Sequence, residues 1–352
     1  MSRPDQPKQI GIMLNSALGD ALLMLPAIQA IRHALPSSQV IAIVERPATA
    51  DFVRLLADRG GDISQVVTLP GRPRRRPFDT WRACSVVRGI GADAIVQSFS
   101  SHGTLANLLM VASGARIRIG FDSGKLRRAA LGASPVPIVV GRHRVDLNRD
   151  AAELLVGDCV DVSRRYLPAL EARASGKVLK QVPSEFVVIA AGSEPKLRGK
   201  RWSPAKWADL AHRLSDDGLQ AVLVGAPSDR AAAREICDQM PDLLDLTGET
   251  SIPDLCLLMT RAAAIVGTDG FPLHLADAMG LKTVGLFGPT DPNEVGPYGG
   301  RDRGHRVLRS SVAVRYTNLT VGTGLDFDPE LEDIAMDDVM DAVADLAGVM
   351  SD

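Results

Sequence analysis

The sequence predicts an α/β protein built from two doubly wound parallel sheets. Short, almost entirely apolar runs alternate with stretches of helical spacing along most of the chain. Buried strands of a parallel sheet with helices on both faces have this pattern. The alternation restarts after the polar stretch 171–184, and 352 residues are enough for two hydrophobic cores.

In the first half, five apolar runs predict strands, and the segments between them predict helices. The strands are expected at 10–14, 40–44, 66–69, 94–97 and 117–119, and the helices at 20–35, 47–58, 80–89 and 104–113. In the first helix, Leu25, Ile28 and Ile31 lie on one apolar stripe. Pro26 is expected to remove one backbone hydrogen bond there and to bend the helix.

The second half repeats the alternation of strands and helices. Strands are expected at 186–190, 220–224, 243–246, 264–266 and 283–287, and helices at 204–214, 229–240, 252–261 and 272–279. The polar stretch 171–184 is interpreted as a linker. We therefore expect one domain over residues 1–175, a second over 176–330, and a C-terminal segment, 331–352, with a helix at 334–346. The cleft between two such halves is the expected site.

Composition excludes several classes of protein. No apolar run approaches the roughly 20 residues that span a bilayer, and the polar N-terminus lacks the apolar core of a signal peptide. The four cysteines lie far apart in sequence. They are interpreted as core residues or unreactive surface thiols of a protein in a reducing compartment. Neither half has a G-x-G-x-x-G motif after its first strand, which disfavours an ordinary NAD site. We expect a cytoplasmic protein.

Charge is distributed unevenly along the chain. Residues 1–150 contain 20 basic against 11 acidic residues, whereas the remainder contains 20 against 31. The excess is concentrated in Arg72, Arg74, Arg75, Arg76, Arg82 and Arg88, and in Arg116, Arg118, Lys125, Arg127 and Arg128. A basic half indicates either an anionic partner (a phosphorylated lipid, a membrane surface or a nucleic acid) or a solvated face without a special partner. Nucleic acid is the least favoured, because only 4% of residues are aromatic.

The stretch Asn15–Leu23 follows the first predicted strand and places Asp20 at the start of a helix. Ligands of open α/β sheets bind at the carboxyl ends of strands, where Asp20 can meet a substrate hydroxyl. The alternative is that Asp20 only stabilises the helix N-terminus, a role that Asp performs well.

A cationic loop follows strand 186–190. Gly192 and Ser193 permit close approach of the backbone, and Lys196, Arg198, Lys200 and Arg201 crowd the next residues. Ser203 and Pro204 then predict a helix start. Cations at this place suit a diphosphate leaving group, because negative charge accumulates on it in the transition state. An exposed loop without a ligand could have the same composition.

A second phosphate candidate lies at 267–275, where another strand leads into a helix. The free amides from Gly270 to Leu273 can bind an anion. Asp269 can cap the helix or hold a sugar hydroxyl, and His274 can face a ligand or pack in the core. The turn-rich loop 286–299, after the last strand of this sheet, is a further candidate; the alternative is that its residues only form ordinary turns.

Four motifs in this order and spacing resemble glycosyltransferase family 9, the ADP-heptose:lipopolysaccharide heptosyltransferases. They are S-x-x-G-D at 16–20, K-x-W-x-P at 200–204, D-x-x-P-x-H at 269–274, and L-F-G-P-T-D-P…G-P-Y-G at 286–299. The resemblance extends from about Ile10 to Tyr298. It implies a GT-B architecture, with the acceptor on the first Rossmann-like domain, the nucleotide sugar on the second, and the last helix packed back on the first.

The resemblance also implies a reaction. A heptose or related sugar would pass with inversion from an ADP-sugar to a lipopolysaccharide-core or other anionic cell-surface glycan. The expected place is the cytoplasm, with peripheral contact at the inner face of the inner membrane. No metal or other cofactor is expected, since the ADP-sugar is a substrate, and no nucleic acid.

Several residues take family roles. Asp20 matches the general base, and Lys200 with Lys196 would steady the diphosphate. The other expected donor-binding residues are Gly192, Ser193, Asp269, Gly270, Phe271, Leu273 and His274. The expected acceptor-binding residues are Ser16, Gly19, Arg72, Arg74, Arg75 and Arg76.

Two departures from the family pattern keep alternatives open. Ala190-Ala191-Gly192 replaces the usual His-Pro-Gly, and Asp269-Gly270-Phe271-Pro272 replaces D-[ST]-G-P. Phe271 thus stands where the backbone would approach the diphosphate. The alternatives are a catalytically silent relative that binds a glycan or a partner protein, and a nucleotide-sugar epimerase on the same scaffold. The motifs specify neither the nucleobase nor the acceptor.

Overall fold

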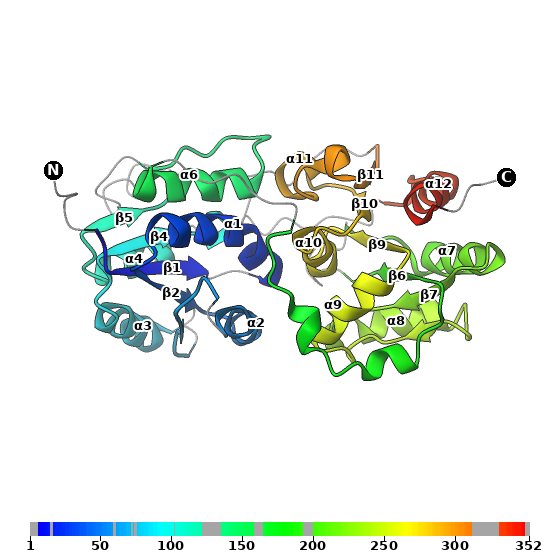
Figure 1. The fold of residues 1–352 in the computed structure, drawn as a ribbon, viewed down its shortest axis with the longest axis horizontal. Coiled ribbons are helices and arrows are strands. Elements are labelled where there is room, and N and C mark those ends of the chain that lie inside the picture. The colour runs from blue at the N-terminus through cyan, green and yellow to red at the C-terminus, as the bar shows by residue number, and fades with distance from the viewer. Residues whose placement is uncertain are drawn as a thin grey trace. The chain divides into compact units, whose positions relative to one another are not determined.

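The computed structural model describes residues 6–14, 17–58, 61–71, 73, 76–101, 103–121, 135–157, 165–192, 200–311 and 331–348. The chain divides into two compact units, Met1–Ser163 and Arg164–Asp352 (Figure 1), and each is described by itself. No helix in the described ranges is long and apolar enough to cross a membrane.

The first unit contains a five-stranded parallel sheet in the order β3-β2-β1-β4-β5. Its strands are β1 (Gln9–Leu14), β2 (Gln39–Val44), β3 (Gln65–Thr68), β4 (Ala94–Gln97) and β5 (Ile117–Ile119). In the register of the central strand, Ile12 lies opposite Ala42 on one side and Val96 on the other. All five strands predicted in this half are present. The strands β1, β2 and β4 are buried almost throughout, whereas the edge strands β3 and β5 are half-buried over most of their length.

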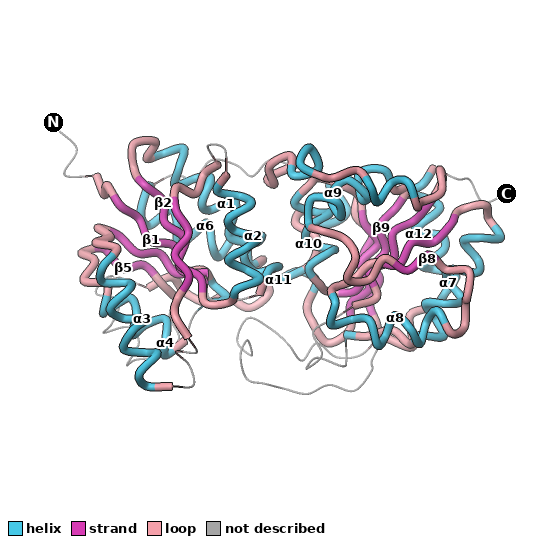
Figure 2. The backbone as a smooth tube through the Cα atoms, turned by 90° about the horizontal axis from the view of Figure 1, so that it is seen from below, coloured by secondary structure: helices cyan, strands magenta, loops and turns pink. Residues whose placement is uncertain are grey.

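Helices cover both faces of this sheet (Figure 2). They are α1 (Leu18–Ala34), α2 (Pro47–Ala57), α3 (Pro77–Gly89), α4 (Thr104–Ala112) and α6 (Arg144–Val156), with a short 3-10 turn, η1 (Phe99–Ser101). Figure 2 shows α1, α2 and α6 on one side of the sheet and α3 and α4 on the other. The helix α1 continues through Pro26. Sequence analysis missed α6, whose arginines and acids interrupt its apolar pattern.

The second unit contains a six-stranded parallel sheet in the order β11-β10-β9-β6-β7-β8. Its strands are β6 (Phe186–Ala190), β7 (Gln220–Leu223), β8 (Leu244–Asp245), β9 (Ala264–Thr268), β10 (Thr283–Phe287) and β11 (Arg306–Arg309). Its helices are α7 (Pro204–Asp216), α8 (Arg230–Cys237), α9 (Ile252–Arg261), α10 (Phe271–Ala278), α11 (Pro292–Val295) and α12 (Met336–Ala347). No strand was predicted at β11, an edge strand in which half-buried and exposed residues alternate.

The C-terminal helix differs from our expectation. We expected it to pack on the first domain, but α12 lies against α7, β9, β10 and β11 of the second unit. Val339 and Val343 are buried in the core that α7 and the sheet share. Lys206 of α7 also donates hydrogen bonds to the carbonyl oxygens of Glu332 and Ile334, at 2.5 and 2.9 Å. The apolar stripe of α12 is thus buried locally.

The stretch interpreted as a linker also belongs to the second unit, which begins before residue 176. Two 3-10 turns, η2 (Leu170–Arg173) and η3 (Lys177–Lys180), pack on α9. The amide nitrogens of Tyr166 and Leu167 both donate to the carbonyl oxygen of Ala278, and the amide and hydroxyl of Ser175 donate to Asp254. The contacts with α9 and the bonds from Ser175 to Asp254 thus hold the predicted linker against the second unit.

Both sheets reverse their strand order at one point. In the first, β2 and β3 lie on one side of β1 and β4 on the other; in the second, the reversal falls between β6 and β9. Ligands of doubly wound folds bind outside the carboxyl ends of the strands at such a point. The candidates for site residues are therefore the polar residues after β1 and β4 in the first unit and those after β6 and β9 in the second.

Candidate active site

Asp20 lies at the carboxyl edge of β1, in the first turn of α1. Its Oδ2 accepts a hydrogen bond from the amide of Ala17 at 3.3 Å, so the carboxylate does stabilise the helix N-terminus. Its Oδ1 accepts a hydrogen bond from the hydroxyl of Ser100 at 2.6 Å. The side chain is 21% exposed, so the helix does not enclose it. The two roles considered for Asp20 are thus compatible.

Two residues that sequence analysis missed orient this carboxylate. Ser100 lies in η1 directly after β4, on the other side of the reversal point from Asp20. Arg144 is the first residue of α6, and its guanidinium lies 3.6 Å from Asp20 Oδ1 and 5.7 Å from the centre of the Phe99 ring. The polar residues that follow β4, the neighbour of β1 at the reversal point, could have indicated Ser100. Arg144 could not be found in this way, because α6 had not been predicted.

In the second unit, Lys200 and Asp269 form an ion pair at the reversal point. The ammonium of Lys200 lies 2.6 Å from Asp269 Oδ2, and the two side chains are 12% and 7% exposed. The Nε2 of His274 lies 3.3 Å from the other carboxylate oxygen. Burial by itself would raise the pKa of Asp269, but the charge of Lys200 and the hydrogen bond of His274 outweigh it and hold that pKa far below its usual range. Asp269 is ionised.

The N-terminus of α10 adjoins this pair. Gly270 is its N-cap residue, with extended backbone, and Phe271 is half-buried. The amide of His274 donates to the carbonyl of Gly270, whereas the side chain of Leu273 packs with Phe287 and Val295. Leu273 can therefore meet a ligand only through its backbone. His274 is 6% exposed, and its Nδ1 has no hydrogen-bond partner in the described part of the chain.

Gly192 lies beside this helix start. The hydroxyl of Thr268 donates to the Gly192 carbonyl at 3.3 Å. A Cβ at Gly192 would stand 2.4 Å from Asp229 Oδ2, so only glycine fits without displacing that carboxylate. Burial raises the pKa of Asp229, against the opposing hydrogen bond from Ala226 and the charge of Arg201. Sequence analysis did not identify Asp229 as a neighbour of this edge.

Two of the expected acceptor-binding residues lie in the described ranges. Gly19 is buried within α1, and Arg76 is the exposed N-cap residue of α3. The following predicted residues lie outside the described ranges: Ser16, Arg72, Arg74, Arg75, Ser193 and Lys196. No group of three or more metal-ligating side chains occurs among the residues that the structure describes.

A buried network around Asp277 supports the G-P-Y-G loop. Asp277 Oδ2 accepts hydrogen bonds from the hydroxyl of Tyr166 and the amide of Tyr298, both at 3.1 Å. The Nε2 of His305 lies 3.2 Å from Oδ1, and its Nδ1 is bonded to Thr283 at 3.0 Å. Burial, and then the charge of Asp277, raise the pKa of Tyr166 well above its usual value. The loop 286–299 is thus held in place by the hydrogen bond from the amide of Tyr298 to the buried Asp277.

Comparison with known proteins places the chain in a family. The profile of glycosyltransferase family 9 (heptosyltransferase) matches residues 101–318. Lipopolysaccharide heptosyltransferase 3 of Escherichia coli is 33% identical over 287 residues, covering 78% of this chain and 81% of the relative. The chain belongs to glycosyltransferase family 9. This confirms the resemblance inferred from the four motifs.

Other matches are shorter or more distant. The chain spans about a third of the length of the first curated relatives it matches. One of them, lipopolysaccharide heptosyltransferase 2 of E. coli K12, is 33% identical over 121 residues, which cover 33% of this chain and 35% of the relative. A family 9 glycosyltransferase structure from Veillonella parvula has a TM-score of 0.77 at 21% identity, covering 97% of this chain and 98% of that one. E. coli heptosyltransferase WaaC with ADP has a TM-score of 0.71 at 20% identity, covering 96% and 99%. These structures confirm the expected GT-B class of two doubly wound α/β domains.

Proposed function

We propose that this family 9 protein is a cytoplasmic enzyme that transfers a heptose or related sugar from an ADP-sugar to a lipopolysaccharide-core glycan, with inversion. The observation that carries this proposal is the Lys200–Asp269 pair beside the N-terminus of α10, at the reversal point of the second sheet. It is supported by the relatives, which are lipopolysaccharide heptosyltransferases, and by the ADP bound to one structure of the same fold.

In this mechanism Asp20 acts as the general base. It takes the proton from an acceptor hydroxyl as that oxygen attacks the anomeric carbon of the sugar. The bond between the anomeric carbon and the diphosphate oxygen breaks in the same displacement, so the configuration at the carbon inverts. Ser100 and Arg144, which contact Oδ1, position the carboxylate for this step.

Lys200 stabilises the leaving group. Negative charge accumulates on the departing diphosphate, and preformed cations and helix amides lower the energy of that state. The ammonium of Lys200 is bound to Asp269 in the structure. We propose that donor binding transfers part of this interaction to the diphosphate, while Asp269 and His274 keep the lysine in place. With this cation and the α10 amides available, no metal is required.

Calorimetric binding of ADP, UDP and GDP, each with a chelator present, tests the donor site. We expect the protein to prefer ADP, and Lys200→Ala to weaken that binding at least about tenfold, the loss of one charge-assisted hydrogen bond of roughly 1.5 kcal/mol or more. Lys177→Ala is the matched control, since Lys177 is exposed in η3. Binding of no nucleotide, or equal binding of all three, would contradict the proposal.

Asp20→Asn distinguishes the enzyme from a silent relative. In a transferase this change removes most of the rate and leaves ADP binding unchanged, because it removes only the base. A glycan- or partner-binding protein would keep its function with Asn at this position. An epimerase would convert the sugar of the donor without any acceptor, so product analysis in the absence of acceptor separates that alternative.

A further inference from the structure

The outer face of α3 and α4 exposes large apolar side chains. Phe78 and Trp81 are 66% and 64% exposed and stack on each other, with ring centres 5.9 Å apart. Val86 continues this surface along α3, and Leu108 and Val111 of α4 are 46% and 48% exposed. Five of the nine exposed large hydrophobic residues in the described ranges thus lie on two neighbouring helices. We call these five residues the α3–α4 face.

The helices do not need these side chains for their own packing. Their opposite sides are buried against the sheet, where Ala83 and Val87 of α3 and Leu109 and Met110 of α4 share a core cluster with Met13. The exposed residues are therefore an addition to that core and not a part of it. An apolar surface of this kind on a folded domain usually marks an interaction site.

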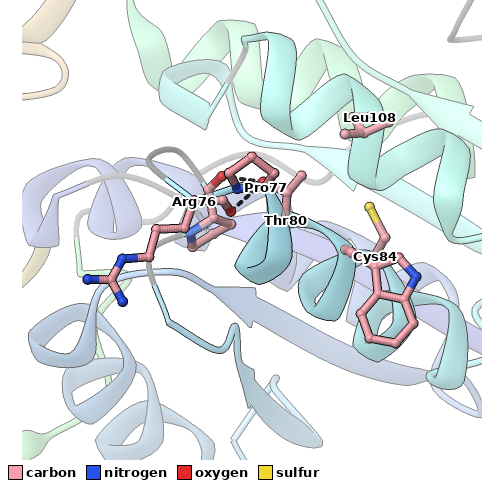
Figure 3. Close-up of a pocket in the computed structure, with 7 residues that line it drawn as sticks. Arg76, Pro77, Thr80, Cys84 and Leu108 are labelled. Atoms are coloured by element: carbon pink, nitrogen blue, oxygen red, sulfur yellow. Dashed lines mark hydrogen bonds between the residues drawn. The ribbon is translucent and has the colours of Figure 1, made fainter.

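A groove opens between the two helices at this face (Figure 3). It is lined by Pro73, Arg76, Pro77, Thr80, Trp81, Cys84 and Leu108. The hydroxyl of Thr80 bonds the carbonyl oxygens of Pro73 and Arg76, at 2.5 and 3.1 Å, and so fixes the rim on which Arg76 stands. The groove is apolar at its walls and cationic at its edge.

The charge on the same surface is of one sign. Arg76, Arg82 and Arg88 are exposed, and the guanidinium of Arg82 lies 5.9 Å from the centre of the Phe78 ring. The only carboxylate within α3 and α4 is that of Asp79, which is 8% exposed. Aromatic residues beside arginines, without exposed acids, match the interface of an anionic bilayer: the rings enter the headgroup region and the cations meet lipid phosphates.

We propose that the α3–α4 face, with Arg76, Arg82 and Arg88, docks the protein on the surface of an anionic lipid bilayer. The inference depends on no step of the proposed transfer reaction, because adsorption needs only this surface. A second copy of the chain or a partner protein would cover the apolar residues equally well. A second copy would place these arginines against arginines of the same sign, and a protein partner would leave anionic vesicles unbound.

Tryptophan fluorescence provides a specific reporter. The chain has three tryptophans, of which Trp202 and Trp207 are 2% and 1% exposed. Vesicles made of equal parts of phosphatidylglycerol and phosphatidylcholine should shift the emission to shorter wavelength, because Trp81 leaves water. Phosphatidylcholine vesicles and high salt should reduce the shift, since both weaken the electrostatic term. In Trp81→Phe the shift should be absent.

Vesicle co-sedimentation measures the affinity. The double variant Phe78→Ser/Trp81→Ser and the double variant Arg82→Gln/Arg88→Gln should each bind at least about tenfold more weakly than the wild type. Leu154→Ser is the control, because Leu154 is 55% exposed on α6. All variants should have the thermal stability of the wild type, since the substituted side chains are exposed.

The proposal is overturned if the wild type does not bind the anionic vesicles, or if the two double variants bind as the wild type does. It is also overturned if sedimentation without lipid shows a dimer that Phe78→Ser/Trp81→Ser converts to a monomer while vesicle binding is absent. In that case the face is a self-association surface.

Discussion

The ammonium of Lys200 lies 2.6 Å from Oδ2 of Asp269, with both side chains almost entirely buried. Two residues separated by 69 positions in sequence thus meet at the carboxyl edge of β6 and β9. Removing charged side chains from water costs free energy, and their mutual attraction offsets that cost only when both partners are present. The pair therefore couples the stability of the second unit to the proposed donor site.

Removal of one partner should be strongly destabilising. We expect Lys200→Met to lower the free energy of unfolding by about 3 kcal/mol at neutral pH, because Asp269 is then left buried and charged beside His274 alone. The double variant Lys200→Met/Asp269→Asn should lose less than the two single variants together, since no uncompensated charge remains. Urea denaturation measures both, with exposed Lys177→Met as the control. Additive losses would show that the pair is not coupled.

Acid should remove the contribution of Asp269. Its pKa in the folded state is held below the value in the unfolded chain, so this group stabilises the protein fully above the unfolded pKa of about 3.9. That contribution declines as the pH falls below that value toward the lower folded pKa. The free energy of unfolding should therefore drop more steeply with acid, between about pH 5 and 2, in the wild type than in Asp269→Asn. Equal slopes would contradict the prediction.

Asp333 gives a comparison for the same titration. Hydrogen bonds from Ser310 and Ser311 lower the pKa of this carboxyl to about 2. It is well exposed to solvent, so Asp333→Asn should change the acid slope less than Asp269→Asn does.

Ser100 should act as a positioning residue for the proposed reaction. We expect Ser100→Ala to lower kcat about tenfold, the equivalent of one hydrogen bond to a charged group, because Asp20 then loses its 2.6 Å partner on Oδ1. ADP binding should not change. Steady-state kinetics and calorimetry provide the two measurements. Ser64→Ala is the matched control, since its hydroxyl accepts a hydrogen bond from the amide of Val40. A change in the KM for the donor alone would place Ser100 in a different role.

Gly192 should tolerate no side chain. In Gly192→Ala the new Cβ meets Asp229 at 2.4 Å, and we expect a loss of about 1–3 kcal/mol in the free energy of unfolding. Gly89→Ala is the matched control, because no atom lies within 4 Å of a Cβ placed there. Adding Asp229→Ala to the first variant should recover part of the loss. If Gly192→Ala is as stable as the wild type, the steric explanation is wrong.

Local patterns predicted most of the fold. The runs at 94–97, 117–119, 186–190 and 283–287 match strands β4, β5, β6 and β10 in every residue. Strands β4, β6 and β10 are buried at every residue and almost entirely apolar, so their burial is visible in composition. Strand β5 contains Arg118 and is half-buried over most of its length. The helix α6 was not predicted, because two of its buried side chains are polar. Arg144 and Asn148 are buried through polar contacts with Asp20, Phe99 and Leu23, and such contacts leave no apolar period in the sequence.

The sequence predicted four residues of the candidate site but neither their contacts nor Ser100, Arg144 and Asp229 beside them. Asp20, Lys200, Asp269 and His274 were identified from their places after strands. Their pairing was not, because it depends on how β6 and β9 lie side by side. The C-terminal helix illustrates the same limit: its apolar stripe predicted a helix but not the surface that would bury it.

The sequence by itself determined the fold class, the positions of most strands and helices, and the family, because these depend on local periodicity and on motifs at strand ends. The tertiary structure alone decided which charges are neighbours. It joined Lys200 to Asp269, Ser100 and Arg144 to Asp20, and α12 to the second unit. The physical reason is that pairing energies depend on distance and burial, and both arise only when segments remote in sequence pack against one another.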